Sequence, residues 1–188
     1  PAHLPRLLTE HLTIQISGEW TGNVQILGFY GCGTLTIKGV DTAILNGSLM
    51  VSNCSCMVRL KNLTVKAAKE MAEKGGYLLH CTTAMAVWIE DCILVGKGNS
   101  SGIRAFESSL VNVITCSVTG CTNAIEAGTN SITTLVYTAR AGYANNSIGV
   151  YAYNGGAAFL CEGIPELVGG ASNYKNGGII IRRNGTLL

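Results

Sequence analysis

The sequence predicts an all-β protein whose 188 residues coil as a parallel β-helix. The first observation is a repeat: homologous strands begin at apolar residues that are 23, 23, 29, 24, 24 and 23 residues apart. The second is that each repeat carries three short runs of period-2 alternation, separated by Gly, Asn and Ser. The third is that no repeat has room for a crossover helix, because a βαβ unit needs about 30 residues or more. One repeat per turn then gives about seven turns of three short strands, each turn about 4.8 Å above the last.

The elements follow this repeat in chain order. Residues 1–11 form an N-terminal cap and residues 12–161 form the coil. The spacing is lost in residues 162–188, which form a C-terminal cap or a terminal hairpin around 176–178. The one long spacing is explained by residues 67–76, AAKEMAEKGG, a helix-forming insertion that two glycines close. The repeats start at Leu12, Leu35, Val58, Val87, Val111, Leu135 and Ala158.

Inward residues of one turn stack on the equivalent residues of the next, and these columns form the core. Cys92 and Cys116 are consecutive members of one such column. The eight Cys lie mostly inside apolar alternation and form no C-x-x-C pattern, which favours free thiols in a reducing compartment over a disulfide framework or a metal site. We therefore expect no metal and no cofactor. The other inward columns contain Leu35, Val58, Val87 and Val111, and Ile37, Leu60, Ile89 and Val113.

Composition excludes some partners. Charged residues make up 13% of the chain and the net charge is +2, which is too small to indicate nucleic acid as a partner. No apolar run reaches the roughly 18 residues of a membrane-spanning helix. The first residues, PAHLPRLLTEHL, contain no signal-peptide hydrophobic region. We therefore expect neither nucleic-acid binding nor membrane insertion.

Since the inward columns are core, function is expected on the outward faces or in the loops. On the first strand of each turn Trp88 follows Arg59 in an outward column. Three interpretations of this ring stay open: a platform on which a sugar stacks, a contact with a neighbouring subunit, or a ring covered by Arg59. The columns expected on this strand are Thr13, Thr36, Arg59, Trp88, Asn112 and Val136, and Gln15, Lys38, Lys61, Glu90 and Ile114.

Opposite charges meet between turns in two of the outward columns. Lys61 precedes Glu90 on the first strand, and Arg104 precedes Glu126 on the third. We expect both to be exposed ion pairs, worth about 0.2–1 kcal/mol each. The column expected on the third strand is Met50, Leu79, Arg104, Glu126 and Gly149.

Catalysis has few candidate residues. The two Asp of the chain, Asp41 and Asp91, lie in different turns at different strand offsets. They form neither the Ca²⁺-binding carboxylates of a pectate-type lyase nor the Asp cluster of a polygalacturonase-like hydrolase. A pair of Glu suffices for glycoside hydrolysis when the carboxyls are about 5–9.5 Å apart. Glu90, Glu107 and Glu126 are the candidates for such a pair, and a ladder of surface charges is the simpler interpretation of them.

Two segments carry a resemblance to a known family. Residues 87–127, VWIEDCILVGKGNSSGIRAFESSLVNVITCSVTGCTNAIEA, resemble the rungs of right-handed parallel β-helix (pectate-lyase-like) domains in bacteriophage tail fibres, tailspikes and neck appendages. Residues 4–37, LPRLLTEHLTIQISGEWTGNVQILGFYGCGTLTI, look like the start of such domains, where a short helix caps the first turn. The resemblance covers residues 4–161. It implies a right-handed coil with a short N-terminal capping helix.

The same resemblance implies a virion tail component that folds in the bacterial cytoplasm, assembles as a homotrimer and recognises a host cell-surface polysaccharide. The residues that we expect to contact the glycan or a partner are Trp88, Arg59, Arg104 and Glu126. Two alternatives stay open: a polysaccharide-degrading glycoside hydrolase or lyase of the same fold, and a bacterial adhesin passenger. The chain lacks the complete acidic cluster that tailspike glycosidases use, so we expect binding without catalysis.

Overall fold

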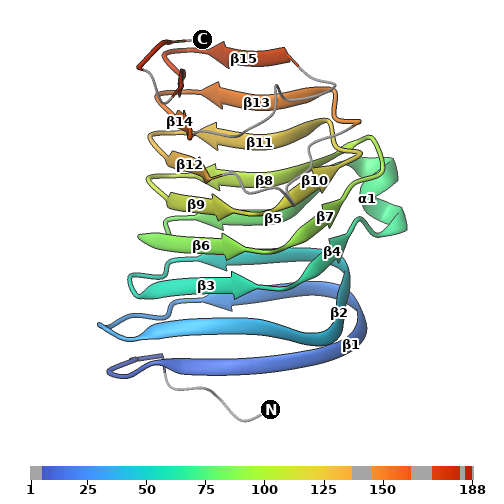
Figure 1. The fold of residues 1–188 in the computed structure, drawn as a ribbon, viewed down its shortest axis with the longest axis vertical. Helices are drawn as coiled ribbons and strands as arrows, with labels where there is room; N and C mark the ends of the chain where they lie inside the picture. Colours follow the sequence, from blue (N-terminus) through green and yellow to red (C-terminus); the bar gives the residue numbers. More distant parts are fainter. Residues whose placement is uncertain (1–5, 137–144, 162–170, 183–184, 188) are drawn as a thin grey trace.

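The computed structural model describes residues 6–136, 145–161, 171–182 and 185–187. These residues form a parallel β-solenoid of about six turns, which confirms the all-β class and lies close to the expected number of about seven turns. All pairings between the named strands are parallel, and the strands stack in columns along the coil (Figure 1). Each column presents one face of the coil.

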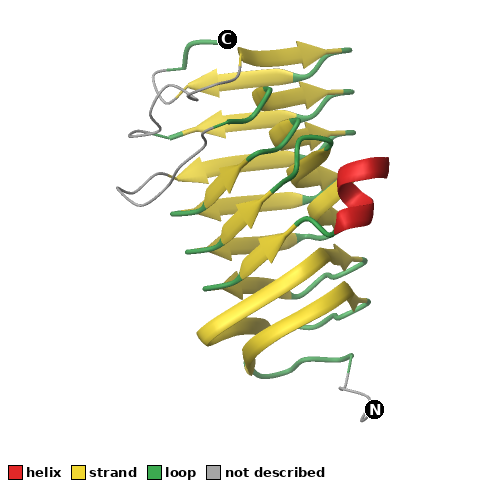
Figure 2. Ribbon diagram, turned by 90° about the vertical axis from the view of Figure 1, so that its right-hand side faces the viewer, coloured by secondary structure: helices red, strands yellow, loops and turns green. Residues whose placement is uncertain are grey.

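The first two turns differ from the rest, because β1 (Leu12–Leu27) and β2 (Thr34–Ser52) each run as one long strand around the coil (Figure 2). Above them the first face consists of β3 (Met57–Lys61), β6 (Ala86–Glu90), β9 (Leu110–Ile114), β12 (Ile132–Val136), β14 (Ala157–Leu160) and β16 (Ile179–Arg182). The second face consists of β4 (Thr64–Lys66), β7 (Ile93–Val95) and β10 (Ser117–Thr119). The third face consists of β5 (Gly76–Thr82), β8 (Ser100–Phe106), β11 (Asn123–Gly128), β13 (Ile148–Tyr153) and β15 (Ala171–Lys175).

The inward columns form the core as expected. Leu35, Val58, Val87 and Val111 lie in one register and are at most 1% exposed. The next member of this column is Thr133, and Leu135, which was expected there, pairs with Val113 instead. The apolar pattern did not reveal this, because Thr133 is a polar residue buried at an interior position.

The register of the third face also differs from the expectation. Met50 pairs with His80, so His80 faces outward where Leu79 was expected, and Leu79 is buried in the core. Leu78 and Leu79 are both buried, so alternation alone does not fix the register of β5. Two turns above Arg104, the outward position is held by Tyr151 and not by Gly149.

The expected insertion is a short helix, α1 (Lys69–Lys74), which lies outside the coil (Figure 2). It ends at Gly75, which adopts a left-handed φ of 77° and donates its N–H to the Met71 carbonyl at 2.9 Å. Met71 packs against the core, so the helix covers part of the coil next to β5.

The N-terminal capping helix is not found in residues 6–11, and the rest of the expected cap, residues 1–5, lies outside the described residues. The segment has bends and one parallel bridge, between Leu7 and Tyr30. Leu8 donates its N–H to the Tyr30 carbonyl at 2.8 Å, and its own carbonyl accepts from Gly33 at 2.9 Å. These bonds satisfy the backbone without a helix.

The coil continues beyond its expected end. β15 and β16 pair in parallel with β13 and β14, so residues 176–178 form a turn between two faces and not the turn of a hairpin. The coil therefore reaches Arg182, while residues 162–170 lie outside the described residues. A single antiparallel bridge between Ile181 and Leu187 follows.

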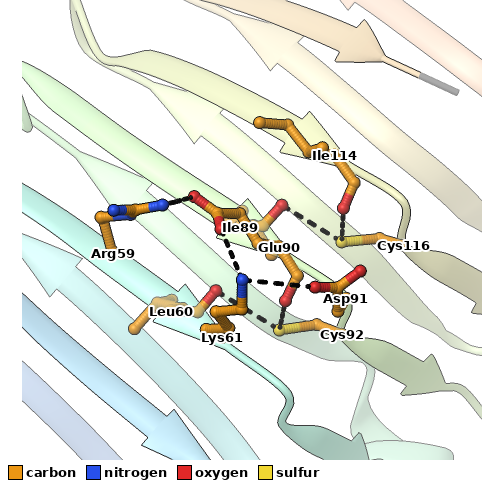
Figure 3. A network of polar contacts seen from close by, with 9 residues as sticks. All are labelled: Arg59, Leu60, Lys61, Ile89, Glu90, Asp91, Cys92, Ile114 and Cys116. Atoms are coloured by element: carbon orange, nitrogen blue, oxygen red, sulfur yellow. Dashed lines mark hydrogen bonds and ion pairs between the residues drawn. The ribbon is translucent and has the colours of Figure 1, made fainter. Parts of the chain in front are cut away.

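All eight Cys are free thiols, which agrees with the expectation, although Cys32 is exposed. Cys92 donates to the Glu90 carbonyl at 3.2 Å, and Cys116 to the Ile114 and Ile89 carbonyls at 3.3 Å each (Figure 3). A hydrogen bond with Cys92 and burial raise the pKa of the Cys116 thiol. Burial also raises the pKa of Cys121 to about 11. The Cys116 and Cys121 thiols therefore stay protonated at neutral pH and react slowly.

We expect a thiol reagent to label Cys32 quickly in the folded protein and to leave Cys92 and Cys116 almost unlabelled, because only Cys32 is exposed. After unfolding without reductant, all eight thiols should react. Peptide mass spectrometry measures both patterns, and a Cys32→Ser variant should remove only the fast reaction. Disulfide-linked peptides recovered without reductant would contradict the thiol column.

Candidate functional site

The third face gathers aromatic and charged side chains on four consecutive strands. Its central outward column runs through Met50, His80, Arg104, Glu126 and Tyr151, which pair from turn to turn. Phe106 and Tyr153 lie two residues after Arg104 and Tyr151, because every second residue of a strand points outward, and Tyr77 precedes the buried pair Leu78 and Leu79. We call the following residues the third-face cluster: Tyr77, His80, Arg104, Phe106, Glu126, Tyr151 and Tyr153.

Arg104 is the centre of this cluster. Its guanidinium carbon lies 4.5 Å from the centroid of the Tyr77 ring and 4.0 Å from that of the Phe106 ring. Its Nε and Nη2 atoms donate to the hydroxyl of Tyr153 at 3.0 and 2.7 Å. Its side chain is 15% exposed, so the aromatic rings and not water surround most of the charge.

A glycine allows Tyr153 to reach Arg104 from two turns away. Gly128 pairs with Tyr153 and lies on the turn between it and Phe106. A Cβ atom at Gly128 would lie 2.4 Å from Cζ of the Tyr153 ring, which is closer than any real contact. The ring therefore lies over the bare backbone of Gly128, and the Tyr153 hydroxyl meets the guanidinium. Tyr151 stacks on the Tyr153 ring, with centroids 5.0 Å apart and planes inclined by 22°.

Glu126 holds a buried carboxylate above Arg104. The residue is 5% exposed. Its Oε1 atom accepts from Ser101 at 2.6 Å and from Asn123 at 2.7 Å, and its Oε2 atom lies 3.7 Å from Nε of Arg104. The expectation of an exposed pair is therefore wrong, because the flanking side chains cover both charges.

His80 lies one turn below Arg104 in the same column. Its ring centroid is 5.1 Å from that of Tyr77 and 6.3 Å from that of Phe106. Burial and the positive charge of Arg104 lower the pKa of His80, and Glu107 opposes this shift. Burial has the opposite effect on a group that ionises to an anion, and it raises the pKa of Tyr153. Both groups are therefore uncharged at neutral pH.

The other expected site residues form a separate network on the first face (Figure 3). Arg59 donates two hydrogen bonds to Oε1 of Glu90, at 3.0 and 2.6 Å, and Lys61 donates to Oε2 at 3.3 Å. Glu90 is 6% exposed, so this pair too is buried on its acidic side, contrary to the expectation. The Arg59 guanidinium lies 5.6 Å from the Trp88 ring, and Trp88 is half-buried. Arg59 therefore covers part of that ring.

The three Glu proposed for catalysis lie in different surroundings. Glu90 is on the first face between two cations. Glu107 follows β8 in a turn with a left-handed φ of 49°, and accepts a hydrogen bond from Thr82 at 2.7 Å. Glu126 belongs to the third-face cluster. Among the described residues, no group of three or more His, Cys, Asp or Glu side chains is arranged to hold a metal ion.

Sequence reasoning found Arg104 and Glu126 but missed the rings around them. An alignment on the small inward residues of the third face, Ala105, Ala127 and Ala152, would have found two of these rings. It places Phe106 and Tyr153, which directly follow Ala105 and Ala152, on the same outward side.

The fold by itself does not assign a function, since one architecture supports both binding and catalysis. In the part of the chain that the structure describes, no helix has the length and apolar character needed to cross a membrane. Comparison with protein-family models, curated proteins and solved structures found no match. The function must therefore be inferred from the side chains of the third face.

Proposed function

We propose that the third-face cluster binds a glycan. The observation that carries this proposal is a set of half-buried rings, Tyr77, Phe106, Tyr151 and Tyr153, around one arginine and one carboxylate. A sugar presents apolar C–H faces that stack on aromatic rings, and hydroxyls that exchange hydrogen bonds with arginine, carboxylate and tyrosine groups. Aromatic side chains combined with a small number of fixed polar groups are typical of a site that binds a small molecule.

The charges of the cluster favour an uncharged sugar. Arg104 and Glu126 face each other at 3.7 Å, so their charges largely cancel. His80 is neutral at neutral pH, and the carboxylate of Glu107 lies close enough to act on it. An acidic sugar would meet the carboxylates of Glu107 and Glu126, and like charges repel.

Binding fits the geometry better than cleavage. Glu126 is held by three partners and is buried, so it is not placed to exchange a proton with a bound sugar. Nε2 of His80 is a buried atom, and a general base must reach the proton that it takes. A polysaccharide-degrading enzyme stays the alternative, with Glu107 and Glu126 as its acid and base.

We further propose that the natural ligand is a host cell-surface polysaccharide and that the chain belongs to a bacteriophage or prophage tail. This part rests on the resemblance of residues 87–127 to tail-fibre and tailspike rungs. The free thiols support it as well, because virion proteins of this kind fold in a reducing bacterial cytoplasm.

The test is an array of immobilised bacterial surface polysaccharides, combined with an assay for new reducing or unsaturated ends. We expect retention on one or a few glycans and no cleavage products. If the wild type cleaves a glycan and Glu126→Gln or Glu107→Gln abolishes this cleavage, the protein is a polysaccharide-degrading enzyme and the proposal of binding without cleavage is wrong. Absence of retention on every glycan would remove the glycan proposal.

Assembly as a homotrimer with Trp88 at or near the interface also remains a proposal. It is supported by apolar outward side chains on the first face, where Leu110, Ile132 and Ile179 are 39%, 42% and 40% exposed in one column. Such a surface is typical of a partner contact. Light scattering should give three times the 19.7 kDa of one chain, and a smaller mass for Trp88→Ala. A monomeric wild type at about 50 µM would contradict this proposal, since stable interfaces of standard size bind more tightly.

A further inference from the structure

His80 and Arg104 share one aromatic enclosure. They are paired neighbours in the central column of the third face, and the rings of Tyr77 and Phe106 contact both of them. These rings present their electron-rich faces to the guanidinium, which is the favourable geometry for one cation. A second cation in the same enclosure would compete with Arg104 for the rings and repel it.

One nitrogen of the imidazole has no hydrogen-bond partner for a proton. Nε2 of His80 is buried and makes no hydrogen bond among the described residues. Below it, the paired residue on β2 is Met50, which carries no charge. A proton on Nε2 would therefore be buried without an acceptor, which disfavours the charged ring relative to the neutral one.

The titratable groups that face His80 come from its own strand and from the turns above. Tyr77 is on β5, Arg104 on β8, and Glu107 directly after β8. Glu126 and Tyr153 contact Arg104 from β11 and β13. Arg104 keeps its charge at every pH of interest, so among these groups the imidazole is the one whose ordinary titration lies nearest neutrality.

We propose that His80 is an acid-sensitive positioning residue: the neutral imidazole keeps Arg104 between Tyr77 and Phe106, and protonation of His80 displaces Arg104 and closes the ligand site. This role of His80 depends on the proposed glycan binding only for the identity of the ligand. Displaced Arg104 no longer donates to Tyr153, so the outer part of the site loses its order as well. Binding is then strong at neutral pH and weak in acid.

The direction of the pH effect follows from the lowered pKa of His80. Above about pH 6.5 the imidazole is neutral in both the folded and the unfolded chain, and it has no effect on stability. As the pH falls below that value, the unfolded chain takes up the proton first, so stability falls. Glycan affinity falls about tenfold for each pH unit below the folded-state pKa, because only the neutral form is competent.

The experiment compares wild type with His80→Gln and with His80→Met, since Met50 occupies the equivalent position one turn below. The Nε–H resonance of Arg104 reports its bond to Tyr153 and needs no glycan. Between about pH 7.5 and pH 4.5 we expect this resonance to shift or broaden in wild type and to stay unchanged in both variants. An unchanged wild-type resonance, or an equal change in the variants, would overturn the proposal.

A second arm uses the polysaccharide retained on the array. Wild type should lose affinity as the pH falls over the same range, while the affinity of His80→Gln, whatever its value at neutral pH, should not change with pH. If no polysaccharide is retained, the glycan proposal fails while the resonance still tests His80. If a polysaccharide is retained with the same affinity at both ends of the range, the acid-sensitive role fails while glycan binding stands.

Discussion

Replacing Tyr151 and Tyr153 together by alanine is expected to weaken glycan binding by at least about 30-fold, since an aromatic hot spot contributes about 2 kcal/mol or more. The two stacked rings point outward from β13, so their removal creates no cavity in the core. The variant should therefore keep the β-solenoid. Calorimetric titration with the polysaccharide retained on the array measures the affinity, and circular dichroism checks the fold.

Trp88→Ala is the matched control, because Trp88 is also an outward, half-buried aromatic residue but lies on the first face. Trp88→Ala should lower the assembled mass, but calorimetry gives the affinity per binding site, and we expect that affinity to be close to that of wild type. A loss as large as that of the double variant would move the site to the first face. Gly128→Ala refines the test: it removes no functional group, yet its Cβ displaces the Tyr153 ring, so binding should weaken.

The sequence was sufficient for the fold because two periodicities agree in it. Alternation identifies the strands, and the repeat of about 23 residues places Leu35, Val58, Val87 and Val111 above one another. It was insufficient where a polar residue fills an inward position. Thr133 is buried in that same column, and an apolar pattern skips it.

The site was only half predictable, for a related reason. Arg104 and Glu126 were identified as neighbours because charges of opposite sign stood one turn apart. Their burial was not predictable, since it depends on Tyr77, Phe106 and Tyr153, whose outward positions follow only from the correct register. A slip of one residue moves a whole strand to the opposite side of the sheet, and this exchanged His80 for Leu79.

The buried carboxylates of Glu126 and Glu90 have different numbers of cationic partners, so removing one arginine should affect them differently. Among the described residues, Glu126 has one cation within 4.0 Å, Arg104. Glu90 has two, Arg59 and Lys61. Arg104→Ala is therefore expected to cost about 3 kcal/mol of the free energy of unfolding, because it leaves a buried charge uncompensated. Arg59→Ala should cost about 1 kcal/mol, since Lys61 still donates to Glu90 at 3.3 Å.

Urea unfolding of both variants measures the difference, provided that the slope against urea is unchanged. The double variant Arg104→Ala/Glu126→Gln removes the stranded charge and keeps an acceptor for Ser101, so it should recover at least about 1 kcal/mol relative to Arg104→Ala. Equal losses for Arg104→Ala and Arg59→Ala, without recovery in the double variant, would show that water reaches Glu126. The carboxylate would then be available to a bound sugar as an acid or base, and the enzyme alternative would gain the group that it lacks.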